Sequence, residues 1–100
     1  MQDRLEIARA EIFRGRQHRL VFLALEEMAY MVSEITKNVN KSIEQTKDGK
    51  TLTLREVSRS LKWLAKRSYA ECLNPTQKQG VKGIVYRLSS KGKQIKKIMP

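Results

Sequence analysis

The stretch TLREVSRSLKWLAKR, residues 53–67, decides how the rest of the chain is interpreted. It opens with Thr-x-x-Glu, the pattern of a capping box. In that motif the hydroxyl of Thr53 accepts from the backbone N–H of Glu56, and the Glu56 carboxylate accepts from the N–H of Thr53. Apolar residues then recur at the spacing of one helical face, at Leu54, Val57, Leu61 and Leu64. The stretch predicts a capped helix with a narrow core stripe.

The remaining face of this helix is polar and mostly cationic. Outside the core stripe it carries Arg55, Ser58, Arg59, Lys62, Lys66 and Arg67. Glu56 is the only acid of the stretch, and the capping box accounts for it. A helix of this kind fits the major groove of duplex DNA, where Arg and Lys reach guanine edges or phosphates. The alternative is an ordinary surface helix with a solvated basic face.

The charge of the whole chain is high and unevenly distributed. The formal net charge is +11, from 21 Lys and Arg against 10 Asp and Glu. Residues 1–50 carry 9 basic and 8 acidic side chains, whereas residues 51–100 carry 12 and 2. A basic half predicts a polyanionic partner, DNA or RNA. An anionic membrane surface fits less well, because the last predicted helix is short and sparsely apolar.

Length and composition exclude several classes of protein. One hundred residues are enough for one domain with a modest core. Cys72 and His18 are each the only residue of their type, so neither an internal disulfide nor a Cys/His metal cluster is expected. The sequence shows no catalytic pattern and no apolar run of membrane-spanning length. Its start lacks the apolar h-region of a signal peptide, so we expect none. We therefore expect a cytoplasmic protein that is not an enzyme and needs no cofactor or metal.

Periodicity upstream of residue 53 predicts three further helices, at residues 2–13, 20–28 and 33–42. The first should end near Gly15, and residues 14–19 are read as a basic junction. The second is apolar on most sides and should be the most buried, followed by a short extended piece at residues 29–31. Ser33 is the expected N-cap of the third. A polar loop with a turn at Asp48-Gly49 follows.

Downstream of residue 67 the pattern changes to strands. Residues 69–73 alternate, and residues 84–88 are β-branched and aromatic, which predicts a hairpin across a loop at 74–83. Ser89 or Ser90 then caps a short helix that carries Ile95 and Ile98. Within this region the spacing Tyr-x-Leu-Ser-x-x-Gly-x-x-Ile is formed by Tyr86, Leu88, Ser89, Gly92 and Ile95.

This spacing, with the Ser/Arg/Lys-rich helix before the hairpin, resembles MarR-like and PadR-like transcriptional regulators. The resemblance runs from about Leu20 to Ile98. It implies an α+β, mostly helical fold: a winged helix-turn-helix, with a three-helix core, a C-terminal β-hairpin wing, and N- and C-terminal helices. We expect one domain over residues 1–100, with residues 1–18 as N-terminal helix and junction and residues 20–98 as the winged-helix core and terminal helix.

The resemblance also implies roles for individual residues in binding double-stranded DNA. The helix at 53–67 would enter the major groove, with base-edge contacts from Arg55, Ser58, Arg59 and Lys62. Lys66 belongs to the same DNA-binding set, and Thr51 or Thr53 would donate to a phosphate at the helix start. Lys78 and Lys82, in the wing at 74–83, would contact the backbone or minor groove. Trp63 is expected to pack on the hairpin or an adjacent helix rather than stack on a base.

The expected function is sequence-specific binding of duplex DNA by a transcriptional regulator. A homodimer could form through the N-terminal helix and the C-terminal helix, since members of the family often pair through terminal helices. The connection before residue 53 is longer than in most relatives, and no small-molecule pocket is evident. Two alternatives stay open: an RNA-binding or ribosome-associated basic module, and a protein-interaction winged helix in a transcription or replication assembly.

Overall fold

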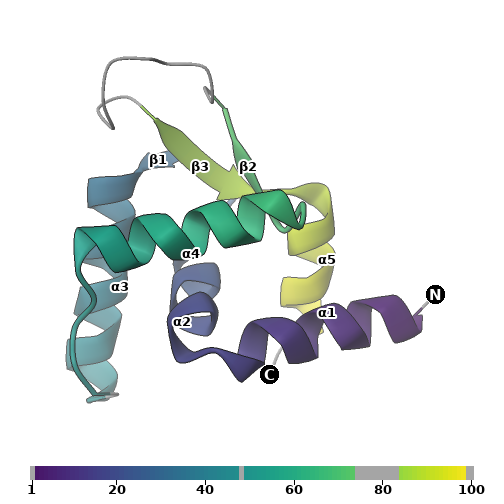
Figure 1. Ribbon diagram of the computed structural model, residues 1–100, viewed down its shortest axis with the longest axis horizontal. Coiled ribbons are helices and arrows are strands. Elements are labelled where there is room, and N and C mark those ends of the chain that lie inside the picture. Colours follow the sequence, from purple (N-terminus) through teal and green to yellow (C-terminus); the bar gives the residue numbers. More distant parts are fainter. Residues whose placement is uncertain (1, 48, 74–83, 99–100) are drawn as a thin grey trace.

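A computed structural model of the chain describes residues 2–47, 49–73 and 84–98, with the side chains of residues 2 and 3 left aside. The described residues form helices and short strands that are labelled in Figure 1. In chain order these are α1 (Gln2–Arg14), α2 (Arg16–Ala24), β1 (Tyr30–Met31), α3 (Val32–Thr46), α4 (Leu54–Lys66), β2 (Ala70–Cys72), β3 (Val85–Leu88) and α5 (Ser90–Lys97). The α+β, mostly helical class predicted from the sequence is confirmed.

Helix α4 begins as the capping box predicts. The N–H of Glu56 donates to the Thr53 hydroxyl at 3.1 Å, and the N–H of Thr53 donates to Glu56 Oε1 at 2.9 Å. Its buried face consists of Val57, Ser60, Leu61 and Leu64. The prediction that Leu54 belongs to this face was wrong, because its side chain is 48% exposed. The i, i+3, i+4, i+7 face instead includes Ser60, which is fully buried.

Helix α2 lies about four residues earlier than predicted at both ends. It begins at Arg16, directly after Gly15, because the basic residues assigned to a junction are good helix formers. It ends at Ala24, and its C-cap Leu25 is extended, so that Met28 is 69% exposed rather than part of the core stripe. Its fully buried residues are Val21 and Phe22. Because the segment is apolar on most sides, its sequence did not show which face is buried.

Helix α3 is longer than predicted, and Ser33 is not its N-cap. The helix begins at Val32, and the N–H of Met31 is satisfied by the Glu34 carboxylate at 2.9 Å. It continues to Thr46, whose hydroxyl bonds the Ser42 carbonyl. The left-handed residue Lys47, with φ of 55°, ends it. The expected core positions Ile35, Val39 and Ile43 are all buried.

The described strands form an antiparallel sheet of order β1-β3-β2. The predicted hairpin is confirmed, since Ala70 pairs with Leu88 and Cys72 with Tyr86. The short extended piece after α2 also joins the sheet, where Tyr30 pairs with Tyr86. Sequence periodicity did not predict this pairing, because a two-residue strand has no measurable alternation. The sheet edge therefore links the end of α2 to the hairpin.

Helix α5 is fixed to the end of α4 through a close backbone contact. As predicted, Ser89 is its N-cap, and the N–H of Gly92 donates to the Ser89 hydroxyl at 2.9 Å. That hydroxyl donates to the carbonyl of Ser68, the left-handed residue that follows α4. A Cβ at position 92 would lie 2.2 Å from the carbonyl oxygen of Tyr69, so glycine is needed for this approach. The serine–glycine spacing thus joins helix and hairpin.

The helices pack around one core beneath the sheet. Figure 1 shows α4 crossing in front of α2, with α3 at one end and α1 and α5 at the other. Helix α1 buries Ala8 and Ile12 in this same core, so contacts within one chain cover the inner part of the apolar stripe of α1. Ile7, on the outer side of α1, is 64% exposed. This arrangement leaves the outer surface of α4 without a covering element among the described residues.

Candidate nucleic-acid interface

The outer surface of α4 is a line of cationic side chains. Arg55, Lys62 and Lys66 follow at i, i+7 and i+11, which places them along one ridge of the helix. All three are exposed, as is Arg59. Among the described residues, no hydrogen bond or ion pair engages the side chains of Arg55, Lys62 or Lys66. Their charge is therefore directed to the solvent or to a partner.

The acid of α4 does not neutralise this ridge. Glu56 accepts from Thr53 N–H through Oε1 and from Gln17 Nε2 through Oε2, the latter at 2.7 Å. The pKa of Glu56 is lowered, first by the backbone hydrogen bond from Thr53, and further by its hydroxyl and by the guanidinium groups of Arg59 and Arg16. The carboxylate is thus ionised and engaged on the side of α4 that faces α2.

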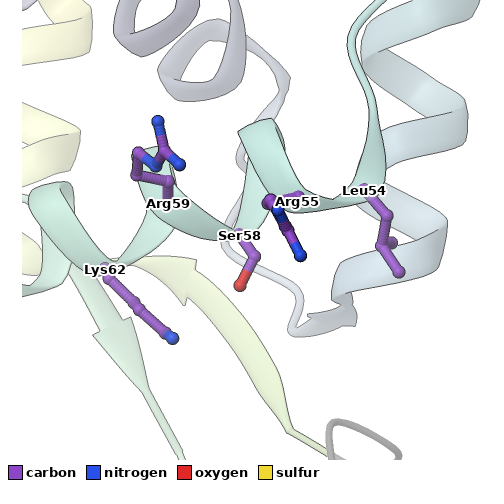
Figure 2. Close-up of a pocket in the computed structure, with 5 residues that line it drawn as sticks. All are labelled: Leu54, Arg55, Ser58, Arg59 and Lys62. Carbon is purple, nitrogen blue, oxygen red and sulfur yellow. The ribbon is translucent and has the colours of Figure 1, made fainter.

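Four of the residues predicted to bind DNA come together on this surface. Arg55, Ser58, Arg59 and Lys62 line one shallow depression of about 480 Å³, together with Leu54. Figure 2 shows that the side chains of Arg55, Ser58 and Lys62 extend to one side of the helix, whereas Arg59 extends to the other. Lys66 continues the ridge, and Thr53 serves as the helix cap. Lys78, Lys82 and the wing at 74–83 lie outside the described residues.

One flank of α4 is bound to the start of α2. The Nδ1 atom of His18 lies 3.0 Å from the buried Ser60 hydroxyl, and its ring stacks on Trp63 with centroids 4.2 Å apart. The guanidinium of Arg67 lies over the same indole. Trp63 therefore packs on an adjacent helix, as the sequence predicted. The pKa of His18 is lowered, first by burial and then by the charge of Arg67.

These contacts give residues 14–19 a structural role. The sequence predicted a basic junction here, but Gln17 and His18 are the residues through which α2 contacts α4. The signal was present in the spacing, because Gln17 and His18 directly precede an apolar helical stripe and continue its period. Their partners, Glu56 and Ser60, are about forty positions away and could not be inferred without the fold.

The opposite flank of α4 faces the hairpin. Ala65 lines a shallow surface hollow together with β2 and the start of α5. Ser58 and Leu54 lie on this same side of the helix by its 3.6-residue period. The ridge of Arg55, Lys62 and Lys66 therefore runs between two walls, the start of α2 on one side and the hairpin on the other.

The loop before α4 is anchored by a side chain that sequence reasoning missed. Asn40 of α3 donates from Nδ2 to the Leu52 carbonyl at 2.9 Å and accepts from the Leu52 N–H at 2.7 Å. Arg16 donates to the Lys50 carbonyl at 2.7 Å. Leu52 itself is 5% exposed. These bonds set where α4 begins, because they fix both sides of the residue that precedes its cap.

The surface offers charge and hydroxyl groups rather than reactive groups. No group of three or more His, Cys, Asp or Glu residues that could hold a metal occurs within residues 2–47, 49–73 and 84–98. In that same part of the chain, no helix has the length and apolar character needed to cross a bilayer. Comparisons of the chain with protein-family models, curated proteins and solved structures gave no match.

Proposed function

We propose that the chain is a winged helix-turn-helix protein that binds double-stranded DNA with sequence preference and acts as a transcriptional regulator. In this proposal α2, α3 and α4 are the helical core, and α4 is the recognition helix. The antiparallel hairpin β2–β3 that follows α4 is the wing, and β1 completes the sheet. The element order and strand order support this assignment of the fold.

The observation that carries the proposal is the cationic ridge on α4. Three exposed cations without a partner among the described residues project from a helix whose acid is engaged elsewhere. A 13-residue helix is about 20 Å long, and an α-helix enters a major groove about 12 Å wide. Arg donates bidentately to guanine, and Lys donates to guanine or phosphate. The ridge can therefore bind both the base edges and the phosphates of a duplex.

The elements on either side of the ridge are also placed where they could contact a duplex. A recognition helix that lies in the groove brings its neighbouring elements against the two phosphate strands. Here those neighbours are the start of α2 and the hairpin. Arg16 and the Arg87–Glu71 pair of the hairpin lie on these walls, and the Lys50 and Thr51 loop stands at the helix start. Contacts to the DNA phosphates on either side would position the ridge without contributing sequence preference.

A binding titration tests the proposal. The chain is titrated with duplex DNA of random sequence and with a structured RNA of equal length, at several salt concentrations. We expect tighter binding to the duplex and a linear fall of log K with log salt, with a slope near −0.9 for each phosphate neutralised. Equal or tighter binding to RNA would favour the RNA-binding alternative. Negligible binding to both at low salt would favour the protein-interaction alternative.

A matched pair of variants locates the binding surface in the same assay. The triple variant Arg55→Ala/Lys62→Ala/Lys66→Ala removes the ridge, and we expect its salt slope to be smaller by about 2 to 3. The control Arg4→Ala/Lys37→Ala/Lys97→Ala removes the same charge from exposed positions on α1, α3 and α5. If the control lost as much affinity as the ridge variant, binding would follow net charge rather than this surface.

We also propose that the regulator is a homodimer. The outer face of α1 presents Ile7 between Glu6 and Arg14, with the small residue Ala10 at its centre, and all four are exposed. An antiparallel pair of α1 helices crossing at Ala10 would place Glu6 of each copy opposite Arg14 of the other. Sedimentation at tens of micromolar tests this, and a monomer at that concentration would refute it.

A further inference from the structure

The cations of α4 are not equivalent, because they project to different sides of the helix. In Figure 2 the Arg59 side chain extends away from those of Arg55, Ser58 and Lys62. Relative to Arg55, a period of 3.6 residues turns Arg59 toward the flank that carries Glu56 and Trp63. That flank is the one bound to α2, through Gln17 and His18. Arg59 therefore leans from the ridge toward the α2 wall.

Around Arg59 the structure gathers a small charged group. The guanidinium groups of Arg59 and Arg16 both act on the Glu56 carboxylate. Arg16 also donates to the Lys50 carbonyl, which brings the loop before α4 to the same place. The two guanidinium groups outweigh the single carboxylate by one positive charge. The α2 wall thus has a net cationic edge.

The position of a side chain relative to the groove decides what it can contact. Base edges lie on the floor of the major groove, which is about 8.5 Å deep, whereas phosphates lie along its two rims. A side chain on the central ridge points at the floor. One that leans toward a wall meets the rim, where contacts fix register but carry no direct sequence information.

We propose that Arg59 is a phosphate-contacting residue without sequence preference, and that Arg55, with Lys62 beside it, determines the base preference. This rests on the proposed function, since it divides the DNA surface of α4 between two tasks. It revises the expectation from the sequence, in which Arg59 reads base edges together with Arg55. The sequence could not make this distinction, because both arginines lie on the same polar face.

Two variants of the same helix test the division. Arg59→Ala and Arg55→Ala each remove one exposed arginine, and their binding to a pool of duplexes with randomised sequence is measured at several salt concentrations. For Arg59→Ala we expect a similar loss of affinity on every duplex, an unchanged base preference, and a salt slope smaller by about 1. For Arg55→Ala we expect a loss of about 5- to 150-fold on the preferred sequence, with a flatter profile at one base pair.

Substitution by lysine separates charge from geometry. Because a phosphate accepts a point charge, Arg59→Lys should recover most of the affinity lost in Arg59→Ala. Arg55→Lys lacks the planar fork that binds guanine bidentately, so it should not recover the preference of the unchanged protein. Thermal unfolding of each variant verifies that the fold is retained.

The outcomes against the proposal are distinct. A change in base preference in Arg59→Ala, or an unchanged preference in Arg55→Ala, would overturn the division while leaving duplex binding intact. Failure of Arg59→Lys to recover affinity would also overturn it. If the unchanged protein showed no preference for the duplex over RNA, the proposed function would fail, and this inference with it.

Discussion

Replacing Asn40 tests whether the loop before α4 is fixed as the structure indicates. Asn40 makes two hydrogen bonds with the backbone of Leu52, one to its carbonyl and one from its N–H. Each bond contributes about 0.5–1.5 kcal/mol net to the free energy of unfolding. The lost bonds in Asn40→Ala should therefore cost about 1–3 kcal/mol, because Leu52 is nearly buried and water replaces the amide poorly.

The same helix provides a matched control. Asn38 is exposed, and no hydrogen bond engages its side chain among the described residues. Both substitutions gain a similar helix propensity, about 0.5 kcal/mol, so the difference between them isolates the two bonds. Chemical denaturation measures the free energy of unfolding of each variant. We expect Asn40→Ala to be less stable than Asn38→Ala by about 2 kcal/mol, or roughly 8–16 °C in Tm for a domain of this size.

The result that refutes this reasoning is a small difference. If the two variants differed by less than about 0.5 kcal/mol, the amide of Asn40 would not hold Leu52, and the start of α4 would depend on its capping box alone. A large fall in the denaturant slope m for Asn40→Ala would also count against it. That result would mean that the substitution changes the compactness of the native or denatured state, rather than removing only the two hydrogen bonds to Leu52.

Two further substitutions test the backbone contact at α5 and the engaged acid of α4. Gly92→Ala places a Cβ against the Tyr69 carbonyl and should lower the free energy of unfolding by about 1–3 kcal/mol. In the control Gly15→Ala the Cβ meets only the His18 side chain at 3.3 Å, so the free energy of unfolding should change by less than about 1 kcal/mol. Equal effects of the two substitutions in chemical denaturation would contradict this. The folded-state pKa of Glu56 lies below its ordinary value of 4.5, so its contribution is present above that pH and is lost as the pH falls through the lower folded value. In thermal melts between about pH 3 and 6, the Tm advantage over Glu56→Gln should therefore shrink toward acid, and a constant difference would refute the role of the carboxylate.

The parts of the fold that follow from local sequence were predicted well. The capping box at Thr53, the N-cap at Ser89 and the hairpin each depend on residues within a few positions of one another. Local hydrogen bonds and side-chain alternation specify such features without reference to the rest of the chain. The core positions of α3 were also predicted, because one clear apolar stripe marks them.

The errors occurred where distant residues decide the structure. The contacts of Gln17 and His18 with Glu56 and Ser60 were missed, because these partners lie about forty positions away in the sequence. Leu54 was placed in the core because its spacing fits the stripe, but the first turn of α4 leaves it exposed. The clamp of Asn40 on Leu52 has no local signature. For the candidate site, residue types were evident from sequence, whereas the different direction of Arg59 required the structure.

We propose above all that the outer surface of α4 contacts duplex DNA. The most direct test of this claim is a map of backbone amide chemical shifts as a duplex is added to the chain. We predict the largest changes along α4 and at the loop and α2 residues beside it, with little change on the outer face of α3, which carries the exposed cations Lys37 and Lys41. Largest changes on α1 or α3, with α4 unaffected, would contradict the claim.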